Sequence, residues 1–190
     1  MQFIDLVRKR YSLRRYDSRP VERSILDRCI EAARLAPSAV NSQPWHFIVV
    51  DEVDTVQALA KAASPKGTIN RFARQAPVIA AIVAEKPKLI AQLGGFAKGK
   101  PFFLFDIGIA AEHFCLQAAE EGVGTCMIGW FNESAARKVL GVPAGKKIAL
   151  LITAGYPREG METKDEDRTL QKKRKTTEDM SSYNRYTKGN

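Results

Sequence analysis

The chain contains 190 residues, 45% of them hydrophobic, and carries a formal net charge of +9. This length fits one domain with a sizeable core, and no apolar run approaches the roughly 20 residues of a membrane-spanning helix. The length predicts a single domain over residues 1–190. Because the N-terminus lacks the apolar stretch of a signal peptide, we expect the protein in the cytoplasm, without membrane contact.

Helical and strand patterns alternate from the N-terminus to about residue 157. Apolar spacing predicts helices over residues 3–10, about 21–36, 53–63, 103–121 and 133–140, with Asn132 as the N-cap of the last. Apolar and β-branched runs predict strands over residues 46–51, 76–84, 125–128 and 147–154. This interspersion indicates an α+β domain, in which helices flank a central mixed or antiparallel sheet.

Three segments have further properties. The helix over 103–121 is apolar on nearly all sides, which indicates a central helix packed on several faces. Residues 86–100 contain Pro87 and three glycines, so we expect a mobile or partly helical excursion that covers a substrate pocket. The tail, residues 158–190, is too polar to become ordered alone and is expected to lie on a partner subunit. The tail and the apolar helix together predict a homodimer.

Basic residues gather near the two ends of the chain. They are Arg8, Lys9, Arg10, Arg14, Arg15 and Arg19 near the start, and Lys172, Lys173, Arg174 and Lys175 near the finish. The sequence shows no helix-turn-helix pattern and no basic ribbon interleaved with aromatic residues. We therefore expect a small anionic ligand and no nucleic acid.

Cysteine and histidine usage argues against several kinds of catalysis. The three cysteines form no CxxC pair, and there are two histidines, His46 and His113. No HExxH motif and no GxSxG motif occurs. We therefore expect no metal site and no serine nucleophile, and we interpret the cysteines and histidines as structural.

The segment Arg10-Tyr-Ser12-Leu-Arg14 is the first candidate binding motif. Alternate residues of an extended chain point the same way, so Arg10, Ser12 and Arg14 are able to converge on one anion. Arginine forms bidentate, charge-assisted hydrogen bonds to phosphate oxygens. A solvated basic loop is the alternative interpretation.

The second candidate motif is the loop from Pro37 to Trp45. Two prolines restrain this loop, in which Ser38, Asn41 and Gln43 carry hydrogen-bonding groups. Such groups match the edges of a flat heteroaromatic ring. A rigid turn whose polar groups bind its own backbone would show the same pattern.

Together the two motifs resemble the N-terminal signature of the nitroreductase family. The pattern is Arg10-x-Ser12-x-Arg14, followed by Ala36-Pro-Ser-x-x-Asn-x-Gln-Pro-Trp-x-Phe47. The resemblance continues through Asn70, Ala76-Pro-Val, the helix from Asp106 to Gly122, Gly124–Gly129, Leu140–Pro143, Gly155–Pro157 and Lys172-x-Arg174. It covers essentially the whole chain. In many relatives Pro-Leu-Glu-Glu follows the basic pair, whereas Lys175-Thr-Thr-Glu178 follows it here, so the register of this pair stays open.

The resemblance implies an intertwined homodimer with two FMN sites at the subunit interface. The phosphate and the polar edge of the flavin would contact Arg10, Ser12, Arg14, Lys172 and Arg174, and Tyr11 would also belong to the cofactor site. The ring would contact Pro37, Ser38, Ala39 and Asn41 from the other subunit, together with Asn70, Met127, Ile128 and Gly129.

The resemblance also implies the reaction. NADH or NADPH would donate electrons, and a nitroaromatic, a quinone or a similar acceptor would then take them in a ping-pong sequence. No side chain would act as an acid or base, so no catalytic residue is assigned. The alternatives are a reductive dehalogenase or other flavin oxidoreductase of the same fold, and a non-catalytic flavin-binding protein.

Overall fold

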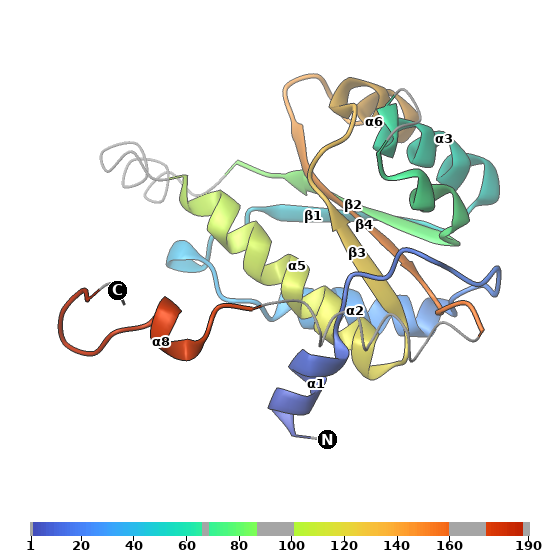
Figure 1. The fold of residues 1–190 in the computed structure, drawn as a ribbon. Coiled ribbons are helices and arrows are strands. Elements are labelled where there is room, and N and C mark those ends of the chain that lie inside the picture. Colours follow the sequence, from blue (N-terminus) through green and yellow to red (C-terminus); the bar gives the residue numbers. More distant parts are fainter. Residues whose placement is uncertain (1, 66–68, 87–100, 160–173, 188–190) are drawn as a thin grey trace.

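A four-stranded sheet forms the centre of the computed structural model, which describes residues 2–65, 69–86, 101–159 and 174–187. The strand order is β1-β2-β4-β3, and all three pairings are antiparallel (Figure 1). The strands are β1 (Trp45–Val50), β2 (Val78–Ala84), β3 (Gly124–Ile128) and β4 (Lys147–Gly155). Each matches an expected strand to within two residues, which confirms the α+β domain with a central sheet.

The longer helices also follow the sequence pattern. They are α1 (Phe3–Lys9), α2 (Arg23–Arg34), α3 (Val53–Ala63), α5 (Phe102–Glu120) and α6 (Glu133–Leu140). The predicted N-cap is confirmed, since the Asn132 side chain accepts a hydrogen bond from the Ala135 amide at 3.0 Å. Short elements that the sequence did not indicate are η1 (Ala39–Asn41), η3 (Arg71–Gln75) and α8 (Thr177–Met180). Elements of about one turn are too short to show a period.

Two helical layers cover the sheet. In β2, Val78, Ala80 and Ile82 face α2 and α5, whereas Ile79, Ala81 and Val83 face α3 and α6. Alternate residues of a strand point to opposite faces, so this strand is apolar throughout. Figure 1 shows α3 and α6 on one side of the sheet, and α2 and α5 on the other.

Helix α5 packs against α1, α2 and the sheet, and part of its surface is exposed. Its inner face buries Phe114, whose ring stacks on that of Phe47 with 5.7 Å between centroids. Its other face exposes Leu104, Phe105 and Ile109. Helix α5 thus packs against several elements, as expected, while an apolar strip near its N-terminal end stays exposed in one chain. Within the described ranges α5 alone has the length and hydropathy of a membrane span, a composition that core helices share.

Most of the expected excursion, residues 87–100, lies outside the described residues, as do residues 160–173 of the tail. The part of the tail from residue 174 to residue 187 is exposed and carries α8. In Figure 1 this part extends away from the sheet and its helices. Its packing on a partner subunit stays a prediction.

Candidate functional site

An extended segment runs along the free edge of β3. Ser12 forms a parallel bridge with Thr125, and the Leu13 amide donates to the Thr125 carbonyl oxygen at 2.9 Å. Leu13 is fully buried, whereas Ser12 is half-buried and Arg14 is exposed. Arg10, Ser12 and Arg14 are thus less buried than Tyr11 and Leu13, an alternation typical of an extended segment.

Gly124 allows the segment to lie close to β3. A Cβ atom on Gly124 would lie 2.8 Å from the Cβ atom of Leu13, closer than such atoms approach in proteins. The glycine is therefore required by a close approach of two backbones. It sets the position of the basic residues on either side of Leu13.

The two guanidinium groups of the segment have different surroundings. Arg10 Nε lies 3.0 Å from Glu112 Oε1 on α5. Arg14 Nη1 donates to the Ser12 carbonyl at 3.2 Å, and the Arg14 guanidinium lies 5.7 Å from the centre of the Phe72 ring. No carboxylate in the described ranges pairs with Arg14, so its charge is available to an anionic ligand.

A buried hydroxyl pair anchors the segment from behind. Tyr16 Oη lies 2.8 Å from the Leu13 carbonyl oxygen and 2.7 Å from Thr153 Oγ1 on β4. Thr153 Oγ1 in turn lies 3.2 Å from the Cys126 carbonyl oxygen on β3. These three contacts share two hydroxyl protons, one from Tyr16 and one from Thr153. Burial raises the pKa of Tyr16 well above its ordinary value, so the phenol stays neutral.

Asn70 connects η3 to the residues that follow β3. Its backbone is left-handed, with φ at 51°. Its Nδ2 atom donates to the carbonyl oxygens of Ala63 at 3.1 Å and Trp130 at 2.9 Å. Both amide protons are therefore used, while Oδ1 accepts no hydrogen bond from the described part of the chain. The structure thus joins Asn70 to Trp130, the residue that follows the predicted site residues Met127–Gly129.

The loop between α2 and β1 has an unusual backbone. Val40, Asn41 and Gln43 have positive φ angles of 48°, 52° and 48°. The Gln43 amide donates to Ser38 Oγ at 2.9 Å, and Gln43 Nε2 donates to Asn41 Oδ1 at 2.8 Å. These bonds use oxygens of Ser38 and Asn41 inside the loop. The Ser38 hydroxyl proton and the Asn41 amide protons donate to no other group in the described part of the chain, so they are available to a ligand.

A buried carboxylate that the sequence analysis missed holds this loop. Asp106 on α5 is only 6% exposed, and both of its carboxylate oxygens lie 3.2 Å from the Ala39 amide nitrogen. The available signal was an acidic residue within the apolar N-terminal half of α5, which reads Phe102-Phe-Leu-Phe-Asp106-Ile-Gly-Ile-Ala-Ala111. Its partner lies 67 residues away in sequence, so the pattern could not identify it.

In one chain the two candidate motifs lie at opposite edges of the sheet. The loop with Ser38 and Asn41 leads into β1, the first strand, whereas Arg14 belongs to the segment outside β3, the last strand (Figure 1). Four strand spacings separate these edges, or about 19 Å. A single chain therefore does not bring Asn41 to Arg14.

The C-terminal basic pair is described only in part. Lys172 lies outside the described residues. Arg174 is exposed, and no hydrogen bond or ion pair joins it to another residue that the structure describes. Its approach to the phosphate therefore stays a prediction.

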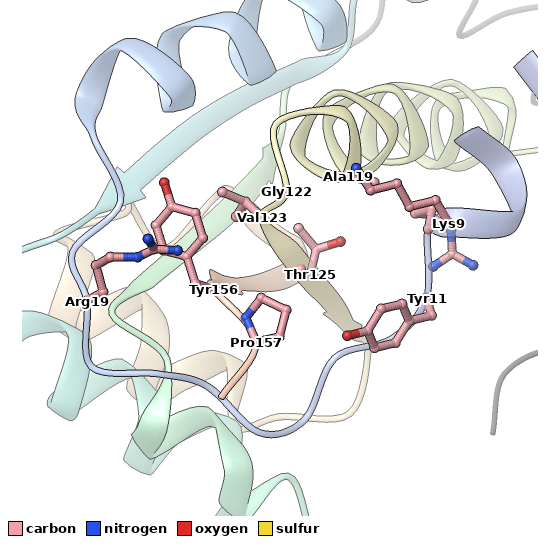
Figure 2. A pocket seen from close by; sticks show the side chains of 11 residues that line it. Lys9, Tyr11, Arg19, Ala119, Gly122, Val123, Thr125, Tyr156 and Pro157 are labelled. Atoms are coloured by element: carbon pink, nitrogen blue, oxygen red, sulfur yellow. The ribbon is translucent and has the colours of Figure 1, made fainter. Parts of the chain in front are cut away.

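A hollow of about 260 Å³ opens beside the N-terminal end of β3 (Figure 2). Lys9 and Tyr11 border one side, and Arg19 and Tyr156 border the other. The Arg19 guanidinium lies 3.4 Å from the centre of the Tyr156 ring. The lining of the hollow includes three basic residues, Lys9, Arg10 and Arg19. The hollow shares Arg10 and Tyr11 with the predicted site.

The cysteines are unsuited to catalysis. Cys29, Cys115 and Cys126 are free and buried. Burial raises the pKa of Cys29 and of Cys115 to about 12, so both thiols stay protonated and unreactive. Among the described residues, no group of three His, Cys, Asp or Glu side chains is placed to hold a metal ion.

Comparison with known proteins identifies a family that the chain resembles over most of its length. Residues 7–156 match the nitroreductase family. A protein of Archaeoglobus fulgidus, provisionally named NADH dehydrogenase/NAD(P)H nitroreductase, is 28% identical over 82% of this chain and 86% of its own length. Iodotyrosine deiodinase 1 of Rattus norvegicus is 28% identical over 86% of this chain and 65% of its own length. The solved structure of an FMN-dependent nitroreductase from Clostridium difficile R20291 superimposes with a TM-score of 0.73, at 27% identity, over 97% of this chain and all of that one.

The α+β fold and these similarities together define the class of the protein as an oxidoreductase. The chain belongs to the nitroreductase family, since the match spans most of its length.

Proposed function

We propose that this nitroreductase-family oxidoreductase is an FMN-dependent homodimer of the cytoplasm that takes electrons from NADH or NADPH. The observation that carries the proposal is the edge segment, where Arg10, Ser12 and Arg14 alternate with buried residues and Arg14 has no carboxylate partner among the described residues. The FMN-dependent structural neighbour supports the cofactor, and the name of the Archaeoglobus relative supports the electron donor.

The hydrogen-bonding groups of the site fit FMN. Guanidinium and hydroxyl donors suit the phosphate and the carbonyl edge of the flavin, and the Asn70 Oδ1 atom suits a ring N–H donor. The proposed phosphate and polar-edge residues are Arg10, Tyr11, Ser12, Arg14, Lys172 and Arg174. Those proposed for the ring are Asn70, Met127, Ile128 and Gly129, with Pro37, Ser38, Ala39 and Asn41 of a second subunit.

The separation of the two motifs, about 19 Å in one chain, supports a second copy of the chain as the source of the loop. Phe3 and Ile4 of α1 and Leu104 and Phe105 of α5 are exposed apolar side chains near these motifs. Contact between two copies would remove them from water. In a two-fold dimer the same contact would bring the loop of each subunit to the Arg14 of the other. The tail, residues 158–190, would pack on the partner in the same assembly.

Bound FMN would supply hydride and electron transfer between NAD(P)H and the second substrate in a ping-pong sequence. Arg14 would place a permanent positive charge beside the flavin and favour negative charge that develops there. Asn70, held by two carbonyl groups, would orient the ring edge. Trp130 is 75% exposed beside Gly129 and offers a flat apolar surface to a planar substrate.

Nitroaromatics, quinones and similar planar acceptors are the proposed substrates. Similarity to iodotyrosine deiodinase 1 of the rat favours a second candidate reaction, reductive dehalogenation. An anaerobic screen of nitroaromatic, quinone and halophenol substrates separates the two. A chain that binds flavin but never accepts electrons from NADH or NADPH would instead be a non-catalytic flavin-binding protein.

The test is an absorbance spectrum of the purified protein with added FMN, followed by anaerobic titration with NADH and NADPH. We expect a bound-flavin spectrum that bleaches on titration. Arg14→Ala should weaken FMN binding at least about tenfold, since charge-assisted bonds to phosphate or ring are lost. Arg8→Ala removes the same charge from the exposed face of α1 and should bind FMN like the unmodified chain. A protein that remains colourless with FMN would refute the proposal.

A further inference from the structure

The loop that the proposed function brings to the partner's flavin is held in a conformation its residues disfavour. Val40 is β-branched, and its φ of 48° lies in the left-handed region, where a branched Cβ is crowded. Asn41 and Gln43 share that region. Such a backbone persists only where surrounding contacts over-determine it.

The hydrogen bonds inside the loop do not orient it relative to the rest of the domain. Gln43 binds Ser38 and Asn41, and the Asn41 amide donates to the Ser38 carbonyl at 3.0 Å. All of these groups belong to the same six residues. They fix the shape of the loop, and they would move with it.

Asp106 ties the loop to a rigid helix. Its two carboxylate oxygens share the Ala39 amide proton, with both N–O distances at 3.2 Å, and its side chain is nearly excluded from water. A buried carboxylate is unfavourable unless donors surround it, so it holds a donor strongly. Ala39 lies between Ser38 and Val40, at the point where the strained backbone begins.

We propose that Asp106 is a positioning residue for the flavin site of the neighbouring subunit. It fixes the loop against α5 before flavin arrives, so that the Ser38 hydroxyl and the Asn41 amide already point to the ligand. Pre-organisation of this kind raises affinity, because ordering is completed before binding. The proposal rests on the proposed function, because it concerns the same flavin site.

Two substitutions separate this role from a structural one. Asp106→Asn retains an oxygen that accepts the Ala39 amide proton, whereas Asp106→Leu has similar volume and no acceptor. Glu120→Leu, at the exposed C-terminal end of α5, is the matched control. The measurements are hydrogen–deuterium exchange of peptides covering residues 37–43 and the dissociation rate of FMN, both in the full-length protein.

For Asp106→Leu we expect exchange over residues 37–43 to rise about tenfold or more with unchanged exchange in β2 and β4, since only the loop opens. FMN dissociation should accelerate by a similar factor, because the loop no longer holds its binding conformation. Asp106→Asn should recover most of both properties, and Glu120→Leu should change neither.

The two readouts fail separately. If Asp106→Leu leaves exchange over residues 37–43 unchanged, Asp106 does not position the loop. If exchange rises and FMN dissociation stays the same, the loop is held but its position does not matter to flavin, which also overturns the proposal. If the unmodified protein binds no FMN, the proposed function fails and so does the proposal that Asp106 serves a flavin site. The exchange result still shows whether Asp106 holds the loop.

Discussion

The phenolic oxygen of Tyr16 lies 2.7 Å from the hydroxyl oxygen of Thr153, in the buried space between the N-terminal segment and β4. Tyr16 also contacts the Leu13 carbonyl, and Thr153 contacts the Cys126 carbonyl. The pair therefore links the segment that carries Arg14 to the two strands behind it. Its loss would loosen the basic edge of the site.

Tyr16→Phe tests this link. The change leaves the ring in place and removes one buried hydroxyl group, so we expect the free energy of unfolding to fall by about 1–2 kcal/mol. Urea denaturation measures the change. Tyr183→Phe, at a side chain that is 92% exposed, is the control and should leave stability as it was. Equal stability in all three proteins would mean that the Tyr16–Thr153 contact contributes nothing.

Gly124→Ala tests the close approach of the edge segment to β3. The new methyl group would overlap Leu13, and the segment with Arg14 would have to move. We expect a loss of about 1–3 kcal/mol in stability, typical of overpacking, together with weaker FMN binding. Thermal denaturation and FMN titration are the measurements. Gly145→Ala, where a Cβ meets nothing within 4 Å, should change neither.

Phe105→Glu tests the proposed subunit interface. Phe105 is 58% exposed in one chain, and a carboxylate at this position would be buried without a partner if α5 packs against a second copy. We expect sedimentation velocity to show monomers, with flavin lost from them. Val53→Glu changes an apolar residue that is 72% exposed on the other side of the sheet, and it should leave the dimer intact. A Phe105→Glu dimer that retains FMN would place the interface elsewhere.

The buried thiols predict a pH dependence of stability. Burial raises the pKa of Cys29 from 9.0 to about 12. Between these values the unfolded chain has lost a proton that the folded chain keeps, so the free energy of unfolding decreases as pH rises. The urea midpoint of Cys29→Ala should therefore fall less steeply than that of the unmodified protein from about pH 8 to about pH 11. Parallel slopes would show that Cys29 ionises equally in both states.

Local patterns predicted much of the fold. The buried strand β2 was evident as an unbroken apolar run, and the Asn132 cap was evident from its position before a helical pattern. The alternation of Arg10, Ser12 and Arg14 with the buried Tyr11 and Leu13 is likewise typical of an extended segment. These features depend on neighbours in sequence, which is why sequence alone was sufficient.

Contacts between distant residues could not be predicted in this way. The bond from Asn70 to Trp130 joins residues 60 apart, and the pair of Asp106 with Ala39 spans 67. The left-handed Val40 contradicts the preference of its residue type, so no local rule would place it there. Each of these features depends on tertiary packing. The strand order, which places Arg14 and Asn41 at different edges of the sheet, likewise depends on pairings between distant segments.

A shared site between two subunits is tested most directly by the flavin content of a purified mixed dimer. One chain carries Arg14→Glu and the other carries Asn41→Glu, and each alone should form a dimer without flavin. In the mixed dimer one site combines both defects, while the other combines an unmodified Arg14 with an unmodified Asn41. We predict about half the FMN of the unmodified dimer, because a two-fold dimer has two such sites. A mixed dimer without flavin would show that Arg14 and Asn41 act within the same chain and would contradict the account.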